Sequence, residues 1–169
     1  MKNMTTLGEG GAVVTDDDEA LTELRGIRQF GGENDGWGTN YKMTRVQAAV
    51  GPVQLRKLDE MIDARRRLAV DRTEMLADNP YLVTPLEPEN CRHSYYLYTL
   101  LVPKEWAGDK RDNLMDLLRE EYGVNTVVAN PPVTRSGGLL GRVTSNQQVP
   151  VSEQLGDRLF CAPIHPKMP

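Results

Sequence analysis

The segment Lys2-Asn3-Met4-Thr5-Thr6-Leu7-Gly8-Glu9-Gly10-Gly11, followed by Ala12-Val13-Val14, is the stretch from which the fold is inferred. One amine precedes small and hydroxylated residues, and two glycines then lead into an apolar run. Glycine lets the backbone approach a neighbour closely. Partial burial would lower the pKa of Lys2, because desolvation disfavours the ammonium form, and a neutral lysine can form a Schiff base. The segment alone leaves open the alternative of an exposed lysine at a frayed terminus.

Further motifs follow in the chain: Asn40-Tyr41-Lys42-Met43-Thr44, the run from Gln47 to Leu55, Pro150-Val151-Ser152-Glu153, and Cys161-Ala162-Pro163-Ile164-His165-Pro166. Together with the lysine segment they resemble the DegT/DnrJ/StrS family of pyridoxal-phosphate (PLP) sugar aminotransferases, in family order and over nearly the whole chain. The resemblance implies an α/β to α+β fold, the C-terminal portion of a fold-type-I PLP transferase. We expect a remnant of the large-domain sheet, a long kinked helix and a small α+β lobe.

The resemblance also implies site residues. Lys2 is expected to hold the cofactor PLP as an imine and then to carry the proton between the substrate and the cofactor. Asn40 and Lys42 match an Asn-Tyr-Arg segment that reaches the partner subunit's cofactor phosphate. Lysine replaces arginine at position 42, which keeps the charge but loses the bidentate geometry. The alternative for this pair is two polar loop residues before a helix cap.

In this family about half of the protein precedes the cofactor lysine, so the chain is expected to correspond to a fragment, without a final helix after Pro169. The expected domains are residues 1–79, the end of the large PLP domain with the connecting helix, and residues 80–169, the small lobe. The expected function is amino transfer to a keto sugar nucleotide from an amino-acid donor by a homodimeric enzyme, with the fragment inactive alone. The alternatives are an inactive regulatory or association module and a helical adaptor built on residues 44–78.

Composition limits the other function classes. The 169 residues carry a formal net charge of −4, so no global basic field attracts nucleic acid or anionic membrane. No apolar run is long enough to span a bilayer and no signal peptide is visible, which favours the cytoplasm. Cys91, Cys161, His93 and His165 lack metal-ligand spacing, so two free thiols and no zinc site are expected.

Local patterns predict the elements of the first half. Residues 12–15 read as a strand, and Asp16-Asp17-Asp18 favour a helix start that ends at Gly31-Gly32. Residues 31–39 are predicted to form a substrate-facing loop. Thr44 and Gln47 form a capping box for a long helix that breaks near Pro52 and ends before Asn79-Pro80.

The second half is predicted to alternate strands and helices. Strands are expected at 94–102 and 124–129 and an extended segment at 160–162, with a loop over 133–148. Asp109 is predicted to cap a helix closed by Gly123, and Ser152 to cap a second one. Four residues are predicted either to line the small-lobe side of the site or only to pack in the core or at the rim of the lobe: His93, Tyr95, Tyr96 and Asn130.

Overall fold

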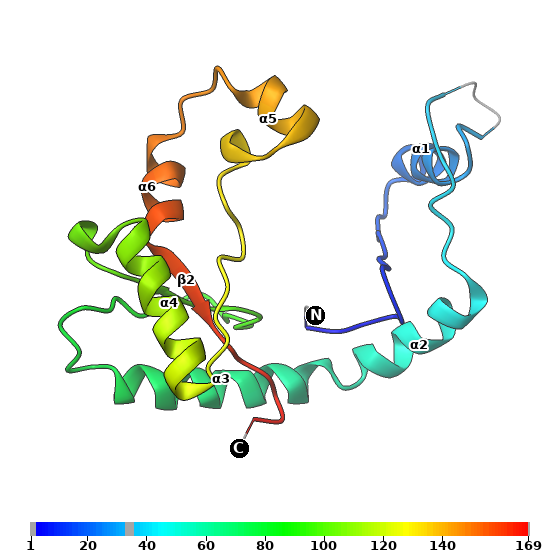
Figure 1. Cartoon of the computed structure of the whole chain (residues 1–169). Helices are drawn as coiled ribbons and strands as arrows, with labels where there is room; N and C mark the ends of the chain where they lie inside the picture. The colour runs from blue at the N-terminus through cyan, green and yellow to red at the C-terminus, as the bar shows by residue number, and fades with distance from the viewer. Residues whose placement is uncertain (1–2, 33–35, 169) are drawn as a thin grey trace. The chain divides into compact units, whose positions relative to one another are not determined.

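The computed structural model describes residues 3–32 and 36–168, and Lys2 lies outside them. The chain divides into two compact units, residues 1–59 and 60–169, which run from blue to cyan and from green to red in Figure 1. The domain boundary predicted between residues 79 and 80 stays a prediction. The contacts that stabilise the two units differ.

Helix α1 (Asp18–Arg28) opens the regular structure of the first unit. The Asp17 carboxylate caps it by accepting hydrogen bonds from the backbone N–H groups of Glu19 and Ala20, at 2.9 and 3.1 Å. The helix start predicted from the acidic triplet is therefore confirmed. The Gly31 N–H donates to the Gly26 carbonyl at 2.9 Å, so the glycine pair closes the helix after its last residue, Arg28.

The strand predicted at residues 12–15 is wrong. These residues form no strand, and the side chains of Val13 and Val14 are 71% and 96% exposed. A strand needs a hydrogen-bonded neighbour, and the described residues of the first unit contain no strand that could pair with this segment. The apolar run predicted a strand but could not supply its partner.

Helices α2 (Arg45–Leu55) and α3 (Leu58–Met75) confirm the predicted interrupted helix. The Thr44 Oγ1 accepts from the Gln47 N–H at 3.2 Å, and the Gln47 Oε1 accepts from the Thr44 N–H at 3.0 Å, so the capping box is present. Pro52 lies inside α2 and the break follows at residues 56–57. Proline removes one backbone donor and crowds the preceding turn, which accounts for the early end of α2.

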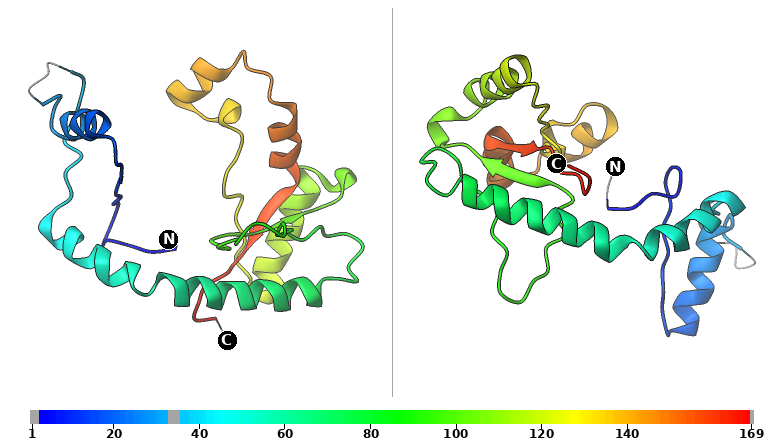
Figure 2. Two further views of the ribbon diagram at one scale, coloured as in Figure 1. Left: turned by 180° about the vertical axis from the view of Figure 1, so that it is seen from behind. Right: turned by 90° about the horizontal axis from the view of Figure 1, so that it is seen from below.

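The second unit is built on a two-stranded antiparallel sheet of β1 (Tyr98–Leu101) and β2 (Leu159–Ala162), seen from two further sides in Figure 2. Thr99 pairs with Cys161, and single bridges add Val83 beside β1 and Val127 beside β2. The strand predicted at 94–102 is thus shorter than expected, and the extended segment at 160–162 is confirmed. The strand predicted at 124–129 is wrong, since only Val127 pairs.

The helices of this unit start differently from the predictions. Helix α4 (Asp109–Tyr122) is preceded by Gly108 rather than capped by Asp109, while Gly123 ends it in the left-handed conformation, as predicted. Ser152 lies inside α6 (Pro150–Arg158), whose N-cap residue is Val149. The predicted loop at 133–148 is also wrong, because it contains the 3₁₀ turn η2 (Val133–Arg135) and helix α5 (Gly138–Thr144). A second 3₁₀ turn, η1, spans Lys104–Trp106.

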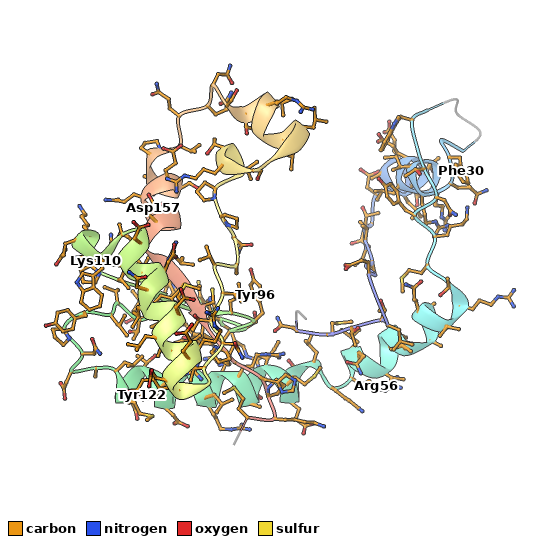
Figure 3. All side chains as sticks on the ribbon, viewed as in Figure 1. Phe30, Arg56, Tyr96, Lys110, Tyr122 and Asp157 are labelled. Atoms are coloured by element: carbon orange, nitrogen blue, oxygen red, sulfur yellow. The ribbon has the colours of Figure 1, made fainter. Side chains whose placement is uncertain are left out.

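The apolar core of the described chain belongs to the second unit. Its side chains come from α3, from both strands and from the segments beside β1, and α4 packs Leu114, Met115 and Leu118 against them. The buried members are Ala69, Tyr95, Tyr98, Leu100, Val102 and Phe160. Figure 3 draws all side chains on the ribbon, with Tyr122 labelled at the end of α4. The small α+β lobe predicted for the second half is confirmed.

Two charged or polar side chains are built into this core. Arg111 of α4, almost fully buried, donates to the carbonyls of Gly156 and Leu159 at 3.1 and 2.6 Å and ties the helix to the start of β2. The Tyr98 hydroxyl lies 2.7 Å from Thr73 Oγ1 of α3. Buried polar groups need such partners, so both contacts fix how the helices pack on the sheet.

Cys91 and Cys161 are free thiols, as predicted, the first exposed and the second buried. Burial raises the pKa of the Cys161 thiol. Within the described residues, every helix is too short or too polar to cross a bilayer.

Candidate functional site

The segment that follows Lys2 forms a tight turn. Thr6 is buried and its Oγ1 donates to the Gly8 carbonyl at 3.2 Å, while Thr5 Oγ1 accepts from the Leu7 N–H at 3.2 Å. Leu7 has a φ of 65° and Gly8 a φ of 137°, which bend the backbone sharply. The small hydroxylated residues noted in the sequence therefore act as local backbone partners that shape the turn.

Gly10 permits a close approach that a side chain would prevent. A Cβ at this position would lie 2.5 Å from Thr6 Oγ1, whereas a Cβ at the adjacent Gly11 would meet no atom within 4 Å. Of the two glycines, only Gly10 is thus required by packing. The buried Asn3 Oδ1, one residue from Lys2, has no hydrogen-bond partner among the described residues. A buried acceptor without a partner is uncommon and calls for a donor.

Gln47 joins this turn to helix α2. Its Nε2 donates to the Glu9 carbonyl at 3.1 Å, while its Oε1 completes the capping box with Thr44. Gln47 was predicted as the capping partner of Thr44. The contact with Glu9 spans 38 residues of chain, and nothing in the local pattern indicates it.

The structure brings Asn40 and Lys42 to the same place as the glycine run. Both line a hollow of about 910 Å³ within the first unit, together with Glu9, Gly10 and Gly11. A bridge between Gln29 and Asn40 holds their segment against the end of α1. The remaining side of the hollow comes from α1, including two side chains that sequence analysis missed, Arg25 and Arg28.

Lys42 is oriented by an aromatic ring. Its Nζ lies 5.0 Å from the centroid of the Phe30 ring, a cation–π arrangement, and Phe30 has a φ of 55°. Tyr41 also lines the hollow and is 60% exposed. The loop predicted at 31–39 lies partly outside the described residues.

The candidates of the second unit fall into two groups. Tyr95 is buried in the core with a φ of 43°, and its N–H donates to His93 Nδ1 at 2.9 Å. The Glu87 carboxylate accepts from Arg66 at 2.6 Å and from the His93 N–H at 3.0 Å. These hydrogen bonds lower the pKa of Glu87, and the one from Arg66 has the largest effect. Burial raises the pKa of Tyr95. His93 and Tyr95 therefore serve the packing of the lobe.

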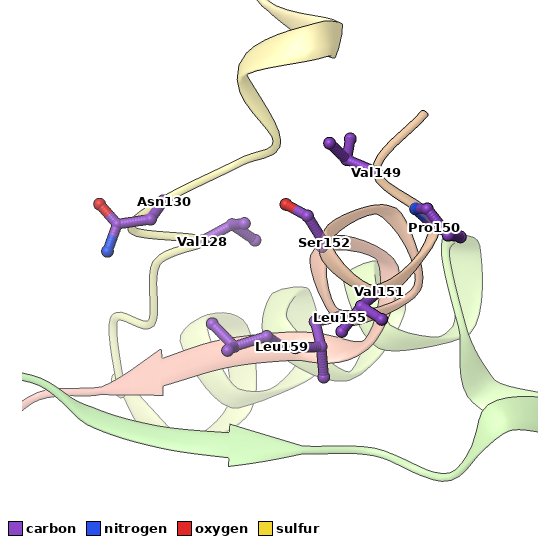
Figure 4. Close-up of a pocket in the computed structure, with 9 residues that line it drawn as sticks. Val128, Asn130, Val149, Pro150, Val151, Ser152, Leu155 and Leu159 are labelled. Atoms are coloured by element: carbon purple, nitrogen blue, oxygen red, sulfur yellow. The ribbon is translucent and has the colours of Figure 1, made fainter. Parts of the chain in front are cut away.

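Asn130 lines a separate hollow of about 570 Å³ in the second unit, shown in Figure 4. Helix α6 supplies Ser152 and Leu155, and Val128 and Asn130 come from the segment before η2. Most of this lining is apolar, with few polar groups to orient a ligand. No group of three or more His, Cys, Asp or Glu side chains that could hold a metal ion occurs among residues 3–32 and 36–168.

A family model described as the DegT/DnrJ/EryC1/StrS aminotransferase family matches residues 1–169. A dTDP-3-amino-3,4,6-trideoxy-alpha-D-glucose transaminase from Micromonospora megalomicea is 30% identical over 99% of this chain and 46% of its own length. The spore coat polysaccharide biosynthesis protein SpsC from Bacillus subtilis is 32% identical over 78% of this chain and 38% of its own. The chain thus spans less than half the length of these relatives.

A solved structure of DesI in the presence of its TDP-sugar product superposes with a TM-score of 0.84 and 28% sequence identity. The superposition covers 99% of this chain and 43% of DesI. The elements described above therefore recur in a protein that handles a nucleotide sugar.

Proposed function

Because the chain belongs to the DegT/DnrJ/EryC1/StrS aminotransferase family, we propose that it carries the lysine-bearing part of a PLP-dependent aminotransferase that acts on a keto sugar nucleotide. The observation that carries the proposal is the family match over residues 1–169, which includes the segment beginning at Lys2. The predicted kinship with fold-type-I PLP transferases is confirmed by the match to DesI.

In this proposal Lys2 has two roles. Its amine would hold the cofactor, and the same amine would accept and return the proton that moves during amino transfer. PLP, when bound, supplies the electron sink that stabilises negative charge at the substrate carbon. The turn built by Thr5, Thr6 and Gly8 fixes the backbone that follows Lys2.

The residues present fit a phosphate-bearing cofactor. Asn40 and Lys42 offer an amide donor and a cation at the hollow that the glycine run lines. Asn3 adds a buried Oδ1 for which no hydrogen-bond donor occurs among the described residues, and which can accept from a hydroxyl group of a ligand. We propose Asn40 and Lys42 as cofactor-binding residues, and, following the family resemblance, a homodimer in which they serve the partner's cofactor. A cytoplasmic location is part of the same proposal.

The alternative of a catalytically inactive association module is not favoured. The relative from Micromonospora megalomicea is a transaminase, and DesI was solved with a sugar-nucleotide product.

The proposal is tested by covalent capture. The protein is mixed with PLP and reduced with borohydride, and the modified lysine is located by peptide mass spectrometry. We expect the label on Lys2, and we expect Lys2→Ala to abolish it together with the absorption band of the imine. Lys57→Ala removes an exposed lysine next to the helix break and serves as the matched control.

Labelling of Lys57 and other surface lysines without preference for Lys2 would overturn the assignment. The α-amino group of the chain is a competing amine, and the peptide map separates it from Lys2. Lys2→Ala that labels as strongly as the unmodified protein would count equally against the proposal.

A further inference from the structure

The hollow of the first unit has a local charge opposite to that of the whole chain. Three basic side chains, Arg25, Arg28 and Lys42, line it with a single carboxylate, Glu9. The chain as a whole has a formal net charge of −4. A concave surface lined mainly by one sign of charge concentrates ligands of the opposite sign, so this hollow favours an anion.

Arg25 and Arg28 are placed to act together. They stand three residues apart in the last turn of α1, a spacing that puts both on the same side of the helix. Within the described part of the chain neither guanidinium takes part in an ion pair or side-chain hydrogen bond. The backbone of Arg28 is anchored, because its carbonyl accepts from the Tyr41 N–H at 3.1 Å.

Helix polarity explains only part of this arrangement. Basic residues near a helix C-terminus interact favourably with the helix dipole, which accounts for Arg25 and Arg28 without a ligand. It does not account for Lys42, which comes from a different segment and lines the same hollow with its ammonium fixed over Phe30. Cations that converge from two segments favour a ligand with more than one negative charge.

We propose that Arg25 and Arg28 bind the diphosphate group of the nucleotide-sugar substrate in this hollow, an identification of the ligand that rests on the proposed function. Guanidinium groups form paired hydrogen bonds with phosphate oxygens, and two of them match the two phosphates of a diphosphate. A single phosphate, such as that of the cofactor, would use only part of the hydrogen-bond donors of these two guanidinium groups. The side of the hollow formed by Arg25 and Arg28 is therefore assigned to substrate recognition, beside the Asn40 and Lys42 side proposed for the cofactor phosphate.

The test measures nucleotide binding without any cofactor. Thymidine diphosphate and thymidine monophosphate are titrated into the protein by calorimetry. We expect the double variant Arg25→Gln/Arg28→Gln to weaken diphosphate binding by about tenfold or more, the scale of losing charge-assisted hydrogen bonds. The matched control is Arg45→Gln/Arg56→Gln, which removes the same charge from exposed arginines of the same unit; Arg56 is labelled in Figure 3.

Three results would overturn the inference: no binding of thymidine diphosphate by the unmodified protein, equal loss in the control double variant, or monophosphate binding as tight as diphosphate binding. Circular dichroism of both double variants checks that the helix content is retained. Borohydride labelling of Lys2 is measured on the same proteins. Loss of that labelling with intact nucleotide binding would count against the proposed function alone, and the reverse pattern against this inference alone.

Discussion

The two units of the chain are held together by different means. The second unit buries Tyr98, Val102 and Phe160 almost completely, whereas the buried residues of the first unit's described part are Thr6 and Gly31. The first unit relies on caps, glycine contacts and single hydrogen bonds. Burial of apolar area is the main source of stability, so the second unit is expected to be the stable one. The proposed site residues all belong to the less stable unit.

The largest expected effect is on the core of the second unit. Phe160→Ala removes a side chain that is 1% exposed, and we expect a loss of about 3–5 kcal/mol in the free energy of unfolding. Val14→Ala truncates a side chain that is 96% exposed, and we expect a change within about 0.5 kcal/mol. Urea denaturation followed by circular dichroism measures both. Similar losses in the two variants would contradict the contrast between the units.

A smaller effect is expected in the first unit from Gly10→Ala. The added Cβ would lie 2.5 Å from Thr6 Oγ1, so the turn must shift, at a cost of about 1–3 kcal/mol. Gly11→Ala meets no atom within 4 Å and is the matched control. Hydrogen exchange of peptides from residues 3–11 and 44–55 reports the local opening. Faster exchange in both variants, or in neither, would show that the close approach of Gly10 and Thr6 does not hold this unit together.

The smallest effect is on the pH dependence of the second unit. The pKa of Glu87 is lowered, chiefly by the hydrogen bond from Arg66, so its stabilising contribution is present above the carboxyl's unfolded pKa and is lost as pH falls through the folded value. We therefore expect Glu87→Gln to have a lower Tm than the unmodified protein at neutral pH, and the difference to shrink towards acid. Glu89→Gln changes a neighbouring exposed carboxylate and is the control. A difference in Tm that stays constant with pH would refute this expectation.

Features set by neighbouring residues were predictable from sequence. The capping box of Thr44 and Gln47 and the glycine end at Gly123 depend on contacts within one helical turn, and both were predicted correctly. Strands at 12–15 and 124–129 were predicted from apolar runs and failed, because a strand depends on a partner that the run does not specify. Helix α5 starts at glycines without a side-chain cap, so its sequence resembled a loop.

The candidate site was predictable in part. Family resemblance named Asn40 and Lys42, which do line one hollow, and Lys2, which lies outside the described residues. Arg25 and Arg28 were missed because basic residues in a last turn are explained by the helix itself. Their spacing of three was the available signal, and only the tertiary fold shows what they face.

The two hydrogen bonds of the Gln47 side chain limit which residues can replace it. Its Oε1 serves the helix start and its Nε2 serves the Glu9 carbonyl, so both ends of one amide are in use. Glutamate completes a capping box equally well in isolation, but it has no proton to offer the carbonyl and adds a negative charge beside it. The requirement for an uncharged amide at position 47 is thus imposed by the backbone carbonyl of a residue 38 positions away.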